Sequence, residues 1–271
     1  MSDELVLVTG ATGKTGRRVV RLLDDLGVAH RETSRTSATR FDWEDRSTWA
    51  PVLEGASALY LIPPYTSVDR AAEALAALGE TAIAAGVRRT ALVSTPDESG
   101  LAAEASLAAS GLATTALRLR WFFQNFSEDF LRDPVRSGEL RLPAGNGAEA
   151  FIDADDIAEA AVRVLTEDGH AGSAYELTGP RLLTFGDIAA AITAATGREV
   201  RYVPLTEAAF IAEQLAFGVP EDWARTSASL YAQIGSGRLA SLSNDVERLL
   251  GRPPRDFAAF ARAAGTQGLW N

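Results

Sequence analysis

Short apolar runs alternate along the chain with longer stretches in which apolar residues recur every three or four positions. Residues 5–8 form such a run and lead into a glycine cluster, as in a strand buried on both faces of a parallel sheet. Beyond Gly16 the apolar residues share one helical stripe, which Gly27 terminates. They are Val19, Leu22, Leu23 and Leu26. The chain is therefore predicted to begin with a strand, a glycine turn and a helix.

The same alternation continues through the next 150 residues. We expect strands near residues 28–34, 40–41, 58–62, 91–95, 114–119 and 173–177. Between them we expect helices near residues 68–85, 101–109 and 153–165, and an aromatic-rich helix from Trp121. Since no hairpin signals separate the strands, the pattern predicts an α/β fold with a doubly wound parallel sheet, the Rossmann arrangement.

The last third of the chain is mainly helical. Residues 138–147 are loop-like, with Pro143 and three glycines. Thr184 and Asp187 have capping-box spacing, with Asp in place of the usual Glu or Gln, and open a helix to residue 196. We expect a Rossmann domain over residues 1–178, with 138–152 contributing to its cleft, and a smaller C-terminal substrate lobe over 179–271.

Composition excludes several classes of function. The chain lacks cysteine and has two histidines, so we expect no metal site and no Ser-His-Asp catalysis. With 26 basic and 36 acidic residues its net charge is −10, which disfavours nucleic acid and anionic membranes as partners. No apolar run approaches the roughly 20 residues of a membrane span, and the acidic start does not resemble a signal peptide. We therefore expect a soluble, cytoplasmic protein.

A glycine-rich segment joins the first strand to the first helix. Its glycines let the backbone turn sharply and approach a diphosphate, while the helix N-terminus offers unpaired N–H groups and the positive end of its dipole. The predicted cofactor-binding residues are Gly10, Thr12, Gly13, Lys14, Thr15 and Gly16. A tight turn without a ligand is the alternative. A nucleoside-triphosphate P-loop is excluded, because the position that needs its first glycine holds Val8.

The end of the second predicted strand indicates which dinucleotide binds. Arg35, flanked by hydroxyl residues, can fork onto the 2′-phosphate of NADPH, whereas NAD normally requires an acidic residue there. Glu32 lies within the strand and not at its tip. We therefore predict NADPH, with a solvated surface arginine as the alternative. Asp42 is placed to accept a hydrogen bond from the adenine amino group, or else is an ordinary turn aspartate.

Several segments together resemble the NmrA-like, atypical branch of the short-chain dehydrogenase/reductase superfamily. The resemblance covers nearly the whole chain, and festuclavine/agroclavine dehydrogenases and NADPH:quinone oxidoreductase-like proteins look closest. The segments that carry it are residues 8–13 with Gly16, 34–35, 41–43, 60–64, Glu104 with 110–112, 115–118, 121–126, 151–153, 155–158 and 175–180.

The resemblance implies NADP(H) across the strand tips and a substrate cleft roofed by the C-terminal lobe. It implies that Ile62, Pro63 and Pro64 lie beneath the nicotinamide ribose, and that Ser94 occupies the position of the superfamily's catalytic serine. It also implies that the segment from Trp121 to Asn125, with Phe122, contacts the nicotinamide end. The alternatives are a helix core for the phenylalanines and a turn cap for Asn125.

The usual catalytic relay of the superfamily is missing. Ordinary members use a Tyr-x-x-x-Lys pair, whose lysine lowers the pKa of the phenol. Here no tyrosine has a lysine four residues later, and the sole lysine, Lys14, lies in the glycine segment. Tyr65, Asp97 and Glu104 are the weak candidates for an acid or substrate anchor, against the alternatives of a loop tyrosine, a loop aspartate and a helix-face glutamate.

Two function hypotheses follow. The first is an NADPH-dependent reductase that delivers hydride to a hydrophobic, electron-poor small molecule such as a quinone, enone or iminium, which needs no enzyme acid. The second is a non-catalytic NADP(H)-binding redox sensor that acts through a protein partner. A homodimer is left open. Seven aromatic residues are candidates for either the pocket or the core: Trp121, Phe122, Phe151, Phe210, Phe217, Trp223 and Tyr231.

Overall fold

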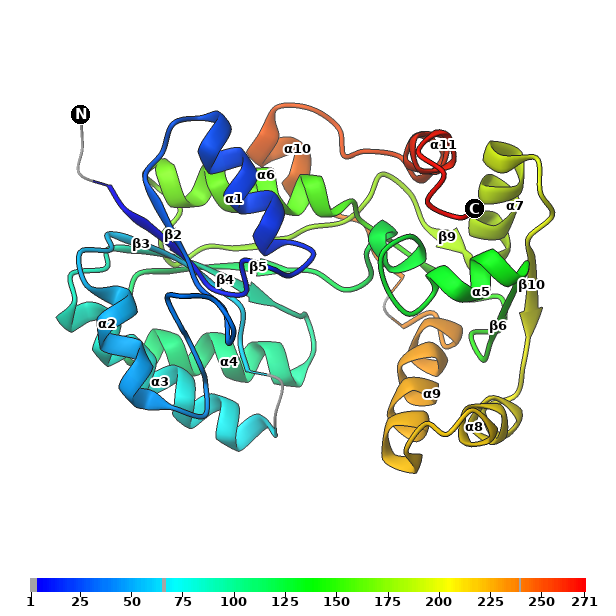
Figure 1. The fold of residues 1–271 in the computed structure, drawn as a ribbon, viewed down its shortest axis with the longest axis horizontal. Coiled ribbons are helices and arrows are strands. Elements are labelled where there is room, and N and C mark those ends of the chain that lie inside the picture. Colours follow the sequence, from blue (N-terminus) through cyan, green and yellow to red (C-terminus); the bar gives the residue numbers. More distant parts are fainter. Residues whose placement is uncertain (1–3, 65–66, 239) are drawn as a thin grey trace. The chain divides into compact units, whose positions relative to one another are not determined.

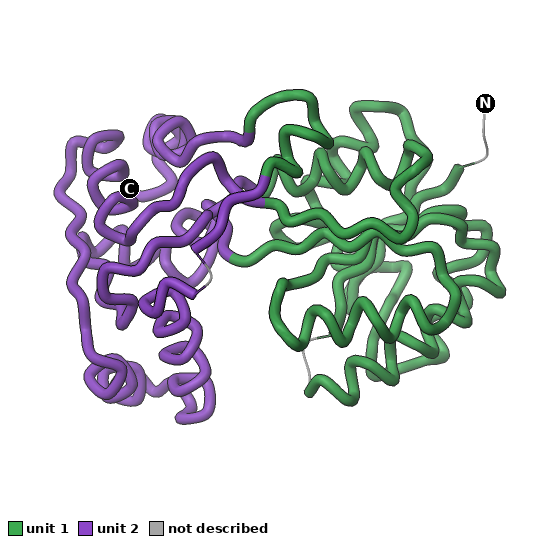
Figure 2. The backbone as a smooth tube through the Cα atoms, turned by 180° about the vertical axis from the view of Figure 1, so that it is seen from behind, with its two compact units in different colours: residues 1–120, 154–177, 244–253 green, residues 121–153, 178–243, 254–271 purple. Residues whose placement is uncertain are grey.

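The chain folds into two compact units that do not follow chain order. The computed structural model describes residues 4–64, 67–238 and 240–271. Unit 1 comprises residues 1–120, 154–177 and 244–253, and unit 2 comprises 121–153, 178–243 and 254–271 (Figure 2). This division differs from the single boundary expected after residue 178. Residues 121–153 pack into unit 2 because their aromatic side chains share its core, and residues 244–253 return to unit 1.

Unit 1 is built on a six-stranded sheet in the order β2-β1-β3-β4-β5-β8, and every pairing in it is parallel. The strands are β1 (Val6–Val8), β2 (His30–Glu32), β3 (Ala58–Leu61), β4 (Arg89–Ser94), β5 (Thr114–Arg118) and β8 (Ala174–Glu176). The predicted doubly wound parallel sheet is thus confirmed, including the late return of β8 to its edge.

Helices cover both faces of this sheet (Figure 1). On one face lie α1 (Gly16–Asp25), α6 (Ala154–Thr166) and α10 (Asp245–Leu250), which pack against one another. On the other lie α2 (Trp49–Leu53), α3 (Val68–Ala84) and α4 (Glu98–Ala109). Because both faces are covered, all four residues of β3 are buried.

One strand predicted in unit 1 is wrong. Residues 40–41 do not form a strand, and only an isolated bridge pairs Arg40 with Ser34. The chain then continues through the short 3-10 helix η1 (Arg46–Thr48) into α2. Trp49 explains this arrangement: its ring is buried and its Nε1 donates to the Asp42 carbonyl oxygen at 2.8 Å, which fixes a turn where an extended strand was expected.

Unit 2 contains two small sheets and several helices. Strand β6 (Glu139–Leu142) pairs in parallel with β10 (Arg201–Pro204), and β7 (Ala148–Glu149) pairs antiparallel with β9 (Leu183–Thr184). The helices are α5 (Arg132–Ser137), α7 (Phe185–Thr196), α8 (Glu207–Ala216), α9 (Glu221–Gly235) and α11 (Phe257–Thr266). The predicted capping box at the start of α7 is confirmed, with both reciprocal hydrogen bonds formed.

Two expectations for unit 2 are wrong. The aromatic segment after Trp121 is not a long helix but the four-residue 3-10 helix η2 (Phe123–Phe126), in which every residue is buried. Even its polar residues, Gln124 and Asn125, are buried, so the segment has no solvent-facing side for a surface helix. Residues 138–147 are only partly loop, because they contain β6.

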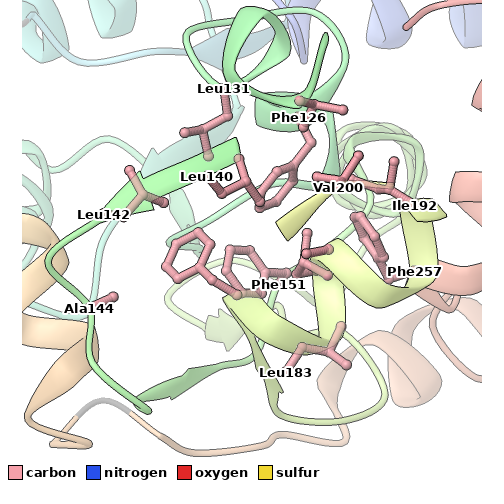
Figure 3. Packing of buried hydrophobic residues seen from close by; sticks show 14 of the residues in the cluster. Phe126, Leu131, Leu140, Leu142, Ala144, Phe151, Leu183, Ile192, Val200 and Phe257 are labelled. Atoms are coloured by element: carbon pink, nitrogen blue, oxygen red, sulfur yellow. The ribbon is translucent and has the colours of Figure 1, made fainter. Parts of the chain in front are cut away.

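The aromatic residues form the core of unit 2. Figure 3 shows Phe126, Phe151 and Phe257 gathered with aliphatic side chains from the strands and helices around them. The rings of Phe126 and Phe151 meet edge to face, with centroids 5.6 Å apart. Such a core holds the segment from Trp121 in place without regular secondary structure.

Candidate functional site

The sheet of unit 1 reverses its strand order between β1 and β3. β2 lies on one side of β1 and β3 on the other, so the crossovers leave in opposite directions and open a crevice at the carboxyl ends. Thr9 joins the two strands there: its Oγ1 donates to the Tyr60 carbonyl oxygen and accepts from the Ile62 N–H, both at 3.0 Å. The glycine segment and the Ile62–Pro64 segment therefore begin side by side.

The glycine segment folds tightly on itself. Gly10 has a φ of +60°, and a Cβ there would lie 2.8 Å from Cδ1 of Ile62. A Cβ on Gly16 would lie 2.2 Å from the Gly10 carbonyl oxygen, closer than atoms can approach. Gly13 donates its N–H to that same oxygen at 2.8 Å. The glycines are thus required by a compact cradle at the N-terminus of α1.

The first turn of α1 has the properties of a diphosphate site. It contains no acidic side chain, and its N-cap, Thr15, makes no side-chain capping hydrogen bond. Arg18 donates to the Lys14 carbonyl oxygen at 2.8 Å and to Asp155 at 3.1 Å, which ties the cradle to the start of α6. The cradle and the open helix end fit the diphosphate of a dinucleotide, because both favour a negatively charged group.

A buried phenol lies next to this turn. Tyr60 of β3 is fully buried, and its hydroxyl lies near that of Thr15 without a well-formed hydrogen bond to any described residue. Burial raises its pKa, against a smaller opposing effect of the Thr15 hydroxyl. The phenol stays protonated at neutral pH.

Arg35 lies where the sequence predicts it, in the loop after β2. It is exposed, and this loop is organised by its hydroxyls: the Ser34 N–H donates to Ser37 Oγ at 2.8 Å, and the Ser37 N–H donates to Ser34 Oγ at 3.0 Å. A hydrogen-bonded loop that presents an exposed guanidinium just beyond β2 suits a 2′-phosphate.

Asp42 is already engaged by protein groups. Its Oδ1 accepts from the Glu44 N–H at 3.1 Å, and its Oδ2 accepts from Arg40 at 2.6 Å. These two hydrogen bonds, with the charges of Arg40 and Arg35, lower its pKa against a small effect of burial. Asp42 therefore acts as a turn aspartate in the structure. Its carboxylate still has lone pairs that could accept the predicted hydrogen bond from adenine. Sequence reasoning missed Arg40, a second cation beside Arg35.

A small polar pocket lies next to Asp42. It has a volume of about 230 Å³ and is lined by Trp43, Glu44, Arg46, Pro64, Arg70, Glu73 and Ala74. Two ion pairs border it, Arg46 to Glu73 at 2.7 Å and Arg70 to Glu44 at 3.0 Å. It combines an indole ring with Pro64 of the predicted cofactor segment. This pocket could not be predicted from the sequence, because its residues come from three separate stretches of the chain.

A three-residue network occupies the carboxyl ends of β4 and β5. Ser94 Oγ donates to Glu104 Oε1 at 2.7 Å, and Arg118 donates to both oxygens of Glu104, at 2.8 and 2.7 Å. Partial burial acts to raise the pKa of Glu104, but Arg118 and Ser94 outweigh it and lower the pKa. Glu104 is therefore ionised at neutral pH and has no proton to give.

Asp97 is also committed. It is the N-cap of α4 and accepts from the Gly100 N–H at 3.0 Å and from the hydroxyls of Thr95 and Ser99, both at 2.7 Å. Partial burial acts to raise its pKa, but these bonds outweigh it and lower the pKa. The third candidate acid, Tyr65, lies outside the described residues.

The remaining predicted contacts belong to unit 2. Trp121 is partly exposed, and its ring lies 5.3 Å from that of Tyr231 and 6.4 Å from that of Phe151. Phe122 is also partly exposed, whereas Asn125 is buried and its N–H donates to the Phe122 carbonyl oxygen at 3.1 Å. Trp121 thus forms the accessible edge of the aromatic core.

The seven aromatic candidates divide by exposure. Phe151, Phe210 and Tyr231 belong to the buried core. Phe217 and Trp223 are exposed, at 80% and 52% of their surface. The sequence pattern alone could not separate these groups, because their exposure depends on how unit 2 packs. Among the described residues, no helix is both long and apolar enough to cross a bilayer.

Comparison with known proteins gives full-length matches, although no family model matches the chain. It is 32% identical over 281 residues to an NAD(P)H azoreductase of Xenophilus azovorans, covering 96% of this chain and 97% of that protein. It is 32% identical over 287 residues to agroclavine dehydrogenase of Claviceps fusiformis, covering 98% of each. The crystal structure of an NADPH-dependent quinone oxidoreductase from Escherichia coli with NADPH has a TM-score of 0.82 and 28% identity, covering 98% of this chain and 100% of that one.

Proposed function

The chain belongs to the NmrA-like, atypical branch of the short-chain dehydrogenase/reductase superfamily, and on that premise we propose that it is an NADPH-dependent reductase of hydrophobic, electron-poor small molecules. It is an oxidoreductase, and NADP(H) is its cofactor. Quinones, enones and iminium ions are the acceptor classes we propose.

The observation that carries the proposal is the glycine cradle with Arg35 beside it. The cradle brings backbone and the open end of α1 to the diphosphate, and Arg35 lies after the neighbouring strand, where the 2′-phosphate needs a cation. Ile62, Pro63 and Pro64 follow the strand on the other side of β1 and are proposed to lie under the nicotinamide ribose. We propose that Thr12, Lys14 and Thr15 line the diphosphate.

The acceptor class follows from the ionisation of the two described candidate acids, Asp97 and Glu104. When bound, the reduced cofactor supplies a hydride. Asp97 and Glu104 are ionised hydrogen-bond acceptors, and neither can protonate a substrate oxygen. An iminium ion needs no proton, and a quinone or polarised enone can collect its proton from water after accepting hydride. The protein then has to bind the substrate, orient it against the cofactor and exclude competing water.

Unit 2 is proposed to supply the apolar surface for such a substrate. Trp121 and Phe122 are partly exposed, and Trp121 packs against the aromatic core. A flat aromatic or hydrophobic ring matches this surface better than a sugar or an amino acid does.

The direct test is NADPH consumption with a panel of quinones, enones and iminium ions, monitored as loss of the reduced cofactor's absorbance. We expect turnover with at least one class, and a loss of preference for NADPH over NADH in Arg35→Ala. If NADPH binds but no acceptor in the panel oxidises it at high enzyme concentration, the reductase assignment is wrong.

A redox sensor is the second candidate, favoured by the missing Tyr-x-x-x-Lys pair. A sensor without catalysis has no reason to prefer the reduced cofactor, so it predicts similar affinities for NADP+ and NADPH. Calorimetry that shows clearly tighter binding of NADPH would count against it.

A further inference from the structure

We infer that Ser94 is a hydrogen-bond acceptor for the nicotinamide half of the cofactor, and that Glu104 and Arg118 are positioning residues which keep the Ser94 hydroxyl proton turned away from it. This inference rests on the proposed function. It extends that function by stating whether the buried hydroxyl at the end of β4 donates a hydrogen bond to the cofactor or accepts one.

Strand order places Ser94 at that half of the site. Arg35 follows β2 and the glycine cradle follows β1, so the adenosine half and the diphosphate occupy that side of the sheet. The other half of a dinucleotide must then extend over β3 and β4, across the point where the strand order reverses. Ser94 is the last residue of β4.

Counting donors and acceptors fixes what Ser94 can offer. A serine hydroxyl has one proton and two lone pairs. Its proton points to Glu104 Oε1 at 2.7 Å, with a longer contact of 3.4 Å to the Thr95 carbonyl oxygen. Ser94 is 3% exposed, and because Glu104 engages its one proton, a ligand group that reaches this hydroxyl finds only lone pairs. Amide N–H and ribose hydroxyl groups are donors that suit it.

Arg118, acting through Glu104, keeps the Ser94 hydroxyl an acceptor toward the ligand. Its guanidinium binds both carboxylate oxygens as a fork, which keeps the carboxyl group ionised and therefore acceptor-only. A protonated Glu104 could donate to Ser94 and turn the hydroxyl proton toward the ligand. Glu176 at the end of β8 also acts on Arg118. Asp97, three residues after Ser94, is held by its own hydrogen bonds.

The test is the dissociation constant of NADP+ measured by calorimetry from pH 5 to pH 8 for the wild type, Ser94→Ala, Arg118→Met and Arg118→Lys. Each variant is expressed relative to the wild type at the same pH, which cancels titration of the cofactor's own phosphate. Arg89→Met is the matched control. Arg89 begins the same strand, and it pairs with two carboxylates, Glu4 and Asp168, at the end of the sheet away from Ser94.

We expect Ser94→Ala to bind about 3- to 10-fold more weakly at every pH, the loss of one hydrogen bond. Arg118→Met should match the wild type near pH 8 and weaken progressively toward pH 5, as Glu104 takes up a proton. Arg118→Lys should restore flat behaviour, and Arg89→Met should show no pH trend. If Arg118→Met does not fold, Glu104→Gln replaces it and should weaken binding equally at every pH.

Two results would overturn the inference: Ser94→Ala that binds like the wild type, or Arg118→Met with the same pH profile as Arg89→Met. If Glu104→Gln is the variant used, wild-type affinity would overturn it as well. A wild type that does not bind NADP+ or NADPH at all would instead refute the proposed function.

Discussion

At the scale of single residues, the choice of cofactor depends on Arg35. A charge-assisted hydrogen bond to the 2′-phosphate is worth about 1.5–3 kcal/mol, which is roughly a 10- to 150-fold change in affinity. We expect Arg35→Ala to weaken NADPH binding by that factor and to leave NADH binding unchanged. Arg88→Ala is the control, because Arg88 is an exposed arginine just before the amino end of β4, away from the carboxyl ends where the cofactor is proposed to bind. Equal losses for both cofactors would contradict the assignment.

A second residue-scale prediction concerns stability. Among the described residues, the buried Tyr60 hydroxyl has no well-formed hydrogen bond, which costs the folded state about 1–3 kcal/mol. Tyr60→Phe removes that polar atom and keeps the ring, so we expect a higher free energy of unfolding in urea and a higher melting temperature. A lower stability would mean that the hydroxyl has a partner, such as a bound water.

At the scale of elements, the turn from β1 into α1 is the most constrained. Gly16→Ala would place a Cβ 2.2 Å from the Gly10 carbonyl oxygen, so the cradle must distort. We expect NADPH affinity to fall by at least tenfold. Gly186→Ala in the first turn of α7 is the control, since its Cβ would meet Thr184 Oγ1 at an ordinary 3.5 Å. That variant should keep wild-type affinity; if the two glycine variants bind alike, the cradle is not the site.

The capping box of α7 leads to a prediction about stability at low pH. Hydrogen bonds from the Thr184 hydroxyl and backbone lower the pKa of Asp187 below its usual 3.8, against a smaller effect of burial. Because its pKa is lower in the folded state, its stabilisation is present above about pH 4 and is lost as the pH falls through the folded value. We expect unfolding free energy to decline below about pH 4. Asp187→Asn should decline less steeply, and an unchanged slope would contradict this.

Elements with strong periodicity were predictable, and those held by tertiary contacts were not. The stripe after Gly16 and the capping box at Thr184 carry local signals, and both form as predicted. Residues 40–41 and 123–126 resemble regular elements in sequence. Their conformations are set instead by a buried indole that bonds to Asp42 and by a core that surrounds η2.

At the scale of the whole molecule, the proposed cofactor site has clearer signals in the sequence than the polar network at the ends of β4 and β5. Each of these signals lies within one short stretch of sequence and can be recognised there: the glycine segment, Arg35 and the alternating strands. The network of Ser94, Glu104 and Arg118 joins residues up to 24 positions apart on two strands and a helix, so only folding brings them together. The same holds for unit 2, which draws on three separate chain segments.

The account as a whole depends on whether the turn at the N-terminus of α1 binds a pyridine dinucleotide. The most direct measurement is a calorimetric and fluorescence titration of the wild-type protein with NADPH, with Gly16→Ala titrated in parallel. We predict saturable binding at one site per chain, weakened in the variant. A wild type that gives neither heat nor a fluorescence change would contradict the central claim.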